Sequence, residues 1–328
     1  MNKPVLLGID VGGTNLRLGV YRDQTLLWEA RIPAHLAELF GQAASPAAAT
    51  EALLELLARS IDEALAQEPA IAAVGIGFPG FIDPRSQRLS QSPNMPGLRN
   101  LDLVTPLRQH CQRPVRLEND ALAAAYGEYV LAGLHPGSLI YVGLGTGVGG
   151  GLVVDGHPYP GEHGVAMEIG HIIVEAGGRL CGCGNRGCLE QYASASGVPR
   201  TYLERIPGAL LPAEQIAARA AQGDGAALAA FEQAGEALGQ ALAHTLKVVD
   251  VGTVIIGGGL SLSWDLFYPS LRRRLEQDLI PALRDRVQIR QSASQDRAGI
   301  LGAAMLAGRL LAGPDQPASQ PSVTREDS

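Results

Sequence analysis

The sequence predicts an α/β protein, because segments with the pattern of strands alternate with segments that have the pattern of helices. An internal repeat supports this class. An apolar run, a glycine turn and a second apolar run occupy residues 5–20 (VLLGIDVGGTNLRLGV), and the same plan returns at 139–156 (LIYVGLGTGVGGGLVVDG). The repeat predicts two lobes built on one plan, with a cleft between them.

The first half of the chain is expected to contain five strands and three helices. Alternation of apolar and polar residues at 16–20 predicts a strand after the first glycine turn. Ser45-Pro46 is a typical helix start, and apolar residues at four-residue spacing continue that helix to about Gln67. The other expected elements are strands near 5–10, 25–30, 71–77 and 115–117, helices at 105–111 and 120–131, and a loop over most of 83–100.

The second half continues the alternation after the repeated hairpin. Helices are expected at about 195–205, 213–221, 226–248, 264–278 and 298–311, and strands at 251–256 and 286–290. Residues 313–328 (GPDQPASQPSVTREDS) have the composition of a disordered tail.

Composition and charge exclude several classes of protein. A net charge of -7 argues against a nucleic-acid binder. No apolar run approaches roughly 18 residues, so no membrane span is expected. The start, MNKPVLLGID, lacks the features of a signal peptide, which predicts a cytoplasmic setting where thiols stay reduced. Clustered cysteines are then expected to be metal ligands or catalytic groups rather than disulfides.

Residues 167–190 hold a candidate metal site. One imidazole and three thiols make a plausible tetrahedral set for Zn²⁺, supplied by His171, Cys181, Cys183 and Cys188. Glu168 and Glu190 bracket the set, so a metal there would fix two carboxylates relative to one another. We therefore expect a structural zinc that supports a polar binding site.

The first glycine turn, residues 10–15, is a candidate phosphate site. Backbone N–H groups of a tight glycine turn form an anion-binding concavity. Here that turn includes Gly12 and Gly13; Thr14 and Asn15 add side-chain donors, and Asp10 could position a hydrated Mg²⁺. A plain hairpin turn is the alternative interpretation.

Two further glycine segments could approach a ligand. Gly145-Thr146-Gly147 offers a second concavity of the same kind. The G-x-G-x-x-G pattern that it begins is rejected as a dinucleotide motif, because a strand rather than a helix follows. Gly257-Gly258-Gly259 comes after a strand, where a plain strand-to-helix turn is the alternative. A P-loop is excluded, since neither of the two lysines follows a suitable glycine loop.

Asp120 is the candidate general base. It follows a strand and Asn119, at the expected start of a helix whose N-terminus would favour the ionised carboxylate. Phosphoryl transfer requires positioning of the hydroxyl more than a base with a raised pKa. The alternative is that Asp120 is simply the helix N-cap.

Seven motifs occur in the order expected of the ROK family (repressors, open reading frames and kinases): DVGGTN, GFPG, ENDA, GLGTGVGGG, EIGH, CGCGNRGCLE and IIGGG. The resemblance covers residues 5 to about 310. It implies a two-lobed actin-like or hexokinase-type (ribonuclease H-like) ATPase fold, a bacterial cytosolic setting, Mg²⁺-dependent use of ATP, and a homodimer. The expected lobes are residues 1–119 with 298–312, and 120–297 with the zinc segment.

The resemblance also implies roles for individual residues. Asp120 is similar to the family's base, which takes the proton of a sugar hydroxyl. The implied sugar contacts are Asn119, Glu168, His171 and Glu190, with Gly80 and Asn94 as nearby candidates. The implied phosphate and Mg·ATP turns comprise Asp10, Gly12, Gly13, Thr14, Gly145, Thr146 and Gly147, and Gly257 with Gly258 forms the adenosine-side turn. His171 would serve both metal and sugar.

The chain departs from the family pattern at Met167, where a glycine is usual. CGCGNRGCLEQYAS is most similar to bacterial glucokinases of the family, while SPNMPG and GEHGVAMEIGH resemble allose-kinase-like members. Phosphorylation of glucose to glucose 6-phosphate is therefore expected, with fructose, allose, N-acetylglucosamine and N-acetylmannosamine as open alternatives. A sugar-responsive repressor is the alternative from another class. Such repressors carry an added DNA-binding domain, and only four residues precede the first strand here.

Overall fold

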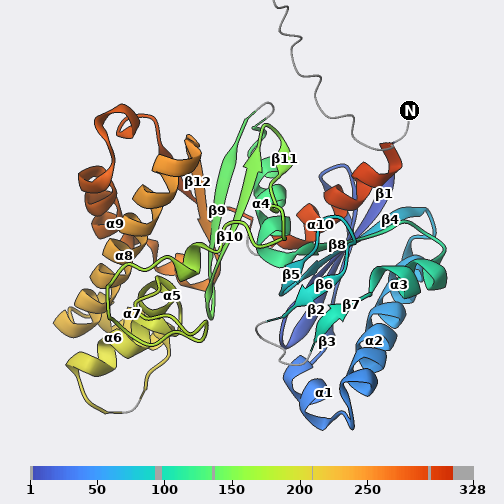
Figure 1. Cartoon of the computed structure of the whole chain (residues 1–328), viewed down its shortest axis with the longest axis horizontal. Helices are drawn as coiled ribbons and strands as arrows, with labels where there is room; N and C mark the ends of the chain where they lie inside the picture. The colour runs from blue at the N-terminus through green and yellow to red at the C-terminus, as the bar shows by residue number, and fades with distance from the viewer. Residues whose placement is uncertain (1–2, 93–97, 135–136, 209, 295–296, 313–328) are drawn as a thin grey trace, which may run out of the picture.

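Two five-stranded sheets form the framework of the protein (Figure 1). The computed structural model describes residues 3–92, 98–134, 137–208, 210–294 and 297–312. The first sheet contains, in spatial order, β3 (Thr25–Pro33), β2 (Asn15–Arg22), β1 (Val5–Val11), β4 (Ile71–Phe78) and β8 (Val115–Asn119). The second contains β11 (His157–Pro158), β10 (Val148–Val154), β9 (Leu139–Leu144), β12 (Thr253–Gly257) and β13 (Gln288–Gln291).

The two sheets share one topology. In each, the central strand pairs antiparallel with the strand that follows it in the chain, as β1 does with β2 and β9 with β10. Its other neighbour runs parallel, as β4 does beside β1 and β12 beside β9. The repeated segments are therefore equivalent strand pairs, which confirms the two-part plan and the α/β class expected from the sequence.

A third, three-stranded sheet, which the sequence did not predict, interrupts the loop expected over most of 83–100. It consists of β5 (Phe81–Ile82), β6 (Leu89–Gln91) and β7 (Arg99–Leu101). These strands are only two or three residues long, too short for an alternating pattern to mark them. Asn94 and the tail at 313–328 lie outside the described residues.

Helices pack on the sheets and between them. The first sheet shares a core with α1 (Leu36–Gln42), α2 (Pro46–Gln67) and α3 (Val104–Cys111). The second packs against α5 (Glu190–Ala193), α6 (Gly197–Arg205), α7 (Ala213–Ala221), α8 (Gly225–Val249) and α9 (Trp264–Asp278). Between the sheets lie α4 (Asp120–Leu131) and α10 (Ala298–Gly308) (Figure 1). Short 3-10 turns are η1 (Ile169–His171), η2 (Gly259–Ser263), η3 (Pro281–Leu283) and η4 (Arg309–Ala312).

The bounds of α2 illustrate how local sequence determines an element. The Ser45 hydroxyl accepts a hydrogen bond from the backbone N–H of Ala48 at 3.2 Å, and Pro46 occupies the first helical position. The helix ends at Gln67, as expected. The shorter α1 was not predicted. Among the described residues, no helix is long and apolar enough to cross a membrane.

Glycines allow α10 to lie directly on its neighbours. A Cβ atom added at Gly75 in β4 would lie 1.8 Å from the carbonyl oxygen of Ala303. One added at Gly302 would lie 1.8 Å from the carbonyl oxygen of Ala123 in α4. No side chain fits at either contact, so α10 connects the first sheet to α4 by backbone packing.

We expect Gly302→Ala to lower the free energy of unfolding by about 2–3 kcal/mol, because overpacking of a close contact forces backbone movement. Urea denaturation monitored by circular dichroism measures the change. The matched control is Gly225→Ala at the start of α8, where an added Cβ would meet no atom within 4 Å. Equal denaturation midpoints for the two variants would contradict the packing argument.

Candidate functional site

The carboxyl ends of three parallel strands meet at one edge of the first sheet. Asp10 near the end of β1 is paired in register with Gly77 of β4, and Phe78 of β4 is paired with Asn119 of β8. A Cβ atom at Gly77 would lie 3.6 Å from the Cα atom of Asp120. The topology therefore brings Asp10 and Asp120 to the same edge, where ligands bind in open α/β sheets.

Asn119, not Asp120, caps α4. The Asn119 side-chain oxygen accepts a hydrogen bond from the N–H of Leu122 at 2.9 Å. Its amide nitrogen donates to the carbonyl oxygen of Gly80 at 3.1 Å. The alternative that Asp120 is merely the N-cap is therefore wrong. Asn119 and Gly80, both expected near a sugar, also hold one another in place.

Asp120 is the first residue of α4, and one of its carboxylate oxygens accepts the N–H of Ala121 at 2.8 Å. Although the residue keeps some exposed surface, the surrounding protein removes enough water that burial raises the pKa of Asp120 above its usual value. The bond from Ala121 opposes this shift without cancelling it. The backbone N–H groups at the helix N-terminus therefore favour the ionised form, as expected, but burial outweighs them.

Glu168 is presented on an inverse γ-turn. The N–H of Ile169 donates to the carbonyl oxygen of Met167 at 2.7 Å, and Glu168 between them has φ -68° and ψ 52°. Met167 has φ 65°, a left-handed conformation that favours glycine. Its side chain packs against the core of the second sheet. The departure from the family pattern therefore places the extra side chain, partly buried, against this core.

Charged groups around Glu168 act on its pKa. The pKa of Glu168 is raised, first by burial and then by repulsion from Asp120 and Glu190, although its side chain is 41% exposed. The imidazole of His171 opposes the shift, with its Nε2 atom 3.6 Å from Glu168 Oε2. A polar group that donates hydrogen bonds would relieve this repulsion.

Glu190, the first residue of α5, joins the metal segment to the second glycine turn. Its Oε2 atom accepts the N–H of Val148 at 3.2 Å, and its Oε1 atom lies 3.9 Å from the Cys181 sulfur. A Cβ atom at Gly147 would lie 2.3 Å from Glu190 Oε2. Gly147 is therefore required for close approach of the carboxylate as well as for the turn.

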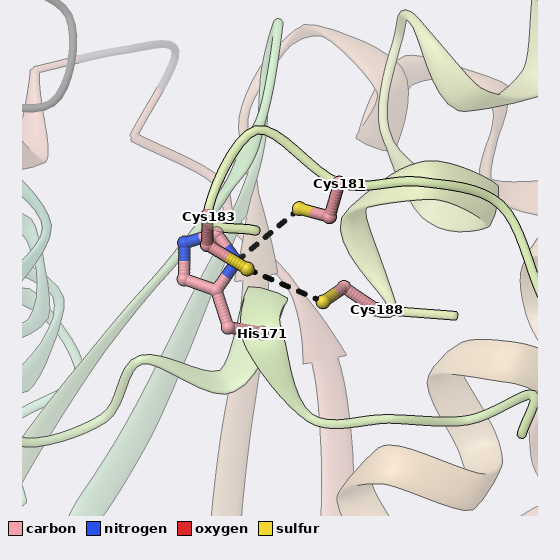
Figure 2. Close-up of side chains that lie close together, drawn as sticks. All are labelled: His171, Cys181, Cys183 and Cys188. Carbon is pink, nitrogen blue, oxygen red and sulfur yellow. Dashed lines mark hydrogen bonds between the residues drawn. The ribbon is translucent and has the colours of Figure 1, made fainter. Parts of the chain in front are cut away.

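The four predicted metal ligands come together (Figure 2). Their ligand atoms, from His171, Cys181, Cys183 and Cys188, all lie within 4.8 Å of one another. Cys183 and Cys188 have sulfurs 3.6 Å apart, and the Cys181 sulfur lies 3.7 Å from His171 Nδ1. Tetrahedral thiolates around a zinc ion would be about 3.7–3.8 Å apart, given Zn–S bonds of about 2.3 Å. The donor set therefore fits a four-coordinate metal.

The two ring nitrogens of His171 face different groups. Nδ1 points to the thiols, while Nε2 points to Glu168. The ring therefore connects the cysteine cluster to Glu168. Cysteine side chains that fix Nδ1 would also fix the direction in which Nε2 points.

The two glycine turns are open on their outer sides. Added Cβ atoms at Gly13 and Gly145 would meet no atom within 4 Å, and Thr14 and Thr146 are exposed. Each turn is closed by one backbone bond, from Gly12 to Asn15 and from Gly145 to Gly147, both at 3.0 Å.

The third glycine segment lies beside the second turn. Gly257 is paired with Gly143 of β9, and a Cβ atom at Gly258 (φ 81°) would lie 2.5 Å from the carbonyl oxygen of Leu144. Since η2 and α9 follow, the segment is also a strand-to-helix turn. The segment is therefore a strand-to-helix turn, and close approach of a ligand to Gly257 and Gly258 stays a prediction.

Comparison with known proteins agrees with this geometry. The sequence model of the ROK family matches residues 6–309. A glucokinase of Thermotoga maritima is 32% identical, and the alignment covers 95% of this chain and 100% of that protein. An N-acetyl-D-glucosamine kinase of Pectobacterium atrosepticum is 33% identical and covers 91% of this chain and 97% of its own.

A solved structure shows that the fold is also shared. It is a ROK family glucokinase from Streptomyces griseus in complex with glucose and AMPPNP. It superposes with a TM-score of 0.75 at 31% identity, covering 93% of this chain and 99% of its own. The actin-like or hexokinase-type fold implied by the motifs is therefore confirmed, and the chain belongs to the ROK family.

Proposed function

We propose that this protein is an ATP-dependent sugar kinase that phosphorylates a hexose hydroxyl, with glucose as its principal substrate. One observation carries the proposal: Glu168 Oε2 lies 3.6 Å from His171 Nε2, and the Cys181 sulfur lies 3.7 Å from His171 Nδ1 and 3.9 Å from Glu190 Oε1. Asp120 and Glu190 also raise the pKa of Glu168. This is a set of hydrogen-bonding groups suited to a polyol. The names of the Thermotoga glucokinase and of the glucose-bound Streptomyces structure support glucose.

In the proposed reaction, Asp120 accepts the proton of the attacking hydroxyl. The sugar oxygen then forms a bond to the γ-phosphorus of ATP, and the bond to the β-phosphate oxygen breaks to release ADP. Glu168 and Glu190 accept hydrogen bonds from other hydroxyls, and His171 orients the ring through Nε2. A carboxyl whose pKa is raised by burial is a stronger proton acceptor once ionised.

The glycine turns are assigned to the nucleotide. Open backbone at Gly13 and Gly145, with Thr14 and Thr146 beside them, would bind phosphate oxygens. Asp10 would hold the hydrated Mg²⁺ that accompanies ATP, and Gly257 with Gly258 would lie on the adenosine side. Bound Mg²⁺ would neutralise charge that develops on the phosphates.

Zinc is proposed as the metal of the cysteine cluster. Three thiolates and one imidazole nitrogen complete a tetrahedral set, so the ion would be structural and would leave no open coordination position. Bound through Nδ1, it would keep His171 Nε2 directed at Glu168. The cytoplasmic setting and the homodimer implied by the family remain predictions. For a homodimer, light scattering should give twice the chain mass of 34.3 kDa.

A second candidate acceptor is N-acetylglucosamine, because relatives with that kinase name are as similar as the glucokinases. We expect a coupled assay of ADP release with Mg·ATP to give the highest kcat/KM with glucose. The panel should include fructose, allose, mannose, N-acetylglucosamine and N-acetylmannosamine. A preference for an N-acetylhexosamine would reassign the substrate, and no turnover of any sugar would contradict the kinase proposal.

A further inference from the structure

Strand β10 runs between the two parts of the candidate site, and three consecutive glycines form its middle. Gly149 and Gly151 face α4: added Cβ atoms would lie 3.1 Å from Ala121 Cβ and 2.5 Å from Ala125 Cβ. Gly150 faces the opposite side, where a Cβ atom would lie 2.4 Å from the carbonyl oxygen of Met167. Alternation along the strand accounts for the two faces.

The contacts on these two faces are next to the residues that carry the chemistry. On one face, Ala121 directly follows Asp120 at the start of α4. On the other face, Met167 O accepts the hydrogen bond that closes the γ-turn presenting Glu168. Only the backbone of β10 therefore separates the helix start that carries Asp120 from the turn that carries Glu168.

We propose that Gly149 and Gly150 are positioning residues that set the separation between Asp120 and the sugar-binding carboxylate Glu168. The proposal rests on the proposed kinase function and adds to it a specific role for the glycine run. A methyl group at Gly149 would push the start of α4 away from β10, and one at Gly150 would push the γ-turn away on the other side. Each change moves one half of the site relative to the other.

The expected effect follows from the distances. Carbon atoms pack best about 3.5–4.0 Å apart. The 3.1 Å contact at Gly149 therefore requires a displacement of about half an ångström. Misplacement of catalytic groups by about 1 Å can cost on the order of 10²-fold in rate. We expect Gly149→Ala to lower kcat about tenfold, with the dissociation constant for glucose within about twofold of the wild-type value.

A double variant that exchanges the glycine and the alanine of this contact distinguishes a positioning role from a general loss of structure. In the double variant Gly149→Ala/Ala121→Gly, the methyl group is moved from one side of the contact to the other. Its kcat is expected within about threefold of that of the Ala121→Gly reference. Gly225→Ala, in open space at the start of α8, is the matched glycine control and should leave kcat and KM unchanged.

Gly150→Ala tests the other face. Its Cβ atom would lie 2.4 Å from the carbonyl oxygen of Met167 and 2.9 Å from Ile169 Cγ2. Because the closer clash is with backbone, trimming a side chain cannot relieve it. Since the turn that bears Glu168 moves, we expect KM for glucose to rise about tenfold and more steeply than kcat falls. The contrasting kcat effect at Gly149 and KM effect at Gly150 would not result from general destabilisation.

The outcomes separate the two proposals. If the wild-type chain phosphorylates glucose but Gly149→Ala retains full kcat, or the double variant stays as slow as Gly149→Ala, the positioning role is wrong. If Gly149→Ala does not fold, a folded and active double variant supports the role, and a double variant that neither folds nor turns over contradicts it. If the wild-type chain phosphorylates no sugar, the kinase proposal itself fails.

Discussion

Asp120→Asn is expected to lower kcat for glucose phosphorylation by about 10²–10⁴-fold, the usual contribution of a general base. The amide is close in size to the carboxylate and can keep the contact with Ala121 N–H, but it cannot accept the proton of the attacking hydroxyl. Glucose affinity measured by calorimetry should change little, because the other hydroxyl contacts remain. Loss of glucose binding would instead make Asp120 a structural or binding residue.

The matched control is Asp155→Asn. Asp155 is exposed, has φ 48° and precedes Gly156 in the turn between β10 and β11. Asn tolerates this left-handed conformation, so kcat should be unchanged. A comparable loss of activity in both variants would show that the assay reports general damage.

Asp120→Asn is also expected to stabilise the folded protein at neutral pH. Burial raises the folded-state pKa of Asp120 above 3.8, so the folded state binds more protons than the unfolded state between these two values. The protonated Asp120 carboxyl therefore adds to the free energy of unfolding at low pH. This contribution is lost as the pH rises through the pKa of Asp120 in the folded state. Asn carries no charge to desolvate, so thermal unfolding at pH 7.5 should occur at a higher temperature for Asp120→Asn. The difference between the two proteins should shrink as pH approaches 4.

Cys188→Ser is expected to abolish metal binding and to impair the sugar site. Cys188 is fully buried in the cluster, and Glu190 follows two residues later at the start of α5. Without the metal, His171 Nδ1 loses its fixed partner, so Nε2 and the two glutamates lose their common geometry. We expect KM for glucose to rise about 10–100-fold, the range found when groups that orient a ligand are removed.

Elemental analysis tests the metal directly. The wild-type protein should contain about one zinc per chain, and the Cys188→Ser variant almost none. Cys111→Ser is the control, because Cys111 is also buried but lies in α3, outside the cluster. Zinc-free wild-type protein, prepared without chelator and with normal KM, would contradict the supporting role of the metal.

Local sequence was sufficient where local interactions determine structure. The start of α2 follows from Ser45 and Pro46, and the glycine-turn repeat predicted two halves built on one plan, which are the two sheets. The short strands between Phe81 and Leu101 could not be predicted, because their pairing depends on tertiary contacts and their composition is that of a loop.

The candidate site, like the fold, could be predicted only in part from the sequence. The Cys₃His spacing identified a cluster that does assemble, because glycines allow the turns between its ligands. The raised pKa of Asp120 could not be predicted, because it depends on burial in the folded protein, which outweighs the backbone N–H groups at the helix N-terminus. Gly149 and Gly150 fall within the glycine turn expected from the sequence, but they belong to β10. Three consecutive glycines at the start of a strand are a signal of close backbone approach.

The most direct test of the proposed catalytic site is a crystal structure of the wild-type protein with glucose and Mg·AMPPNP. We predict that the sugar lies between Asp120 and Glu168, with its 6-hydroxyl about 2.6–3.2 Å from the Asp120 carboxylate. Other hydroxyls should contact Glu168, Glu190 and His171 Nε2, and the phosphates should lie at the two open glycine turns. A sugar bound away from Asp120, or an Asp120 carboxylate that faces no hydroxyl, would contradict the proposed catalytic site.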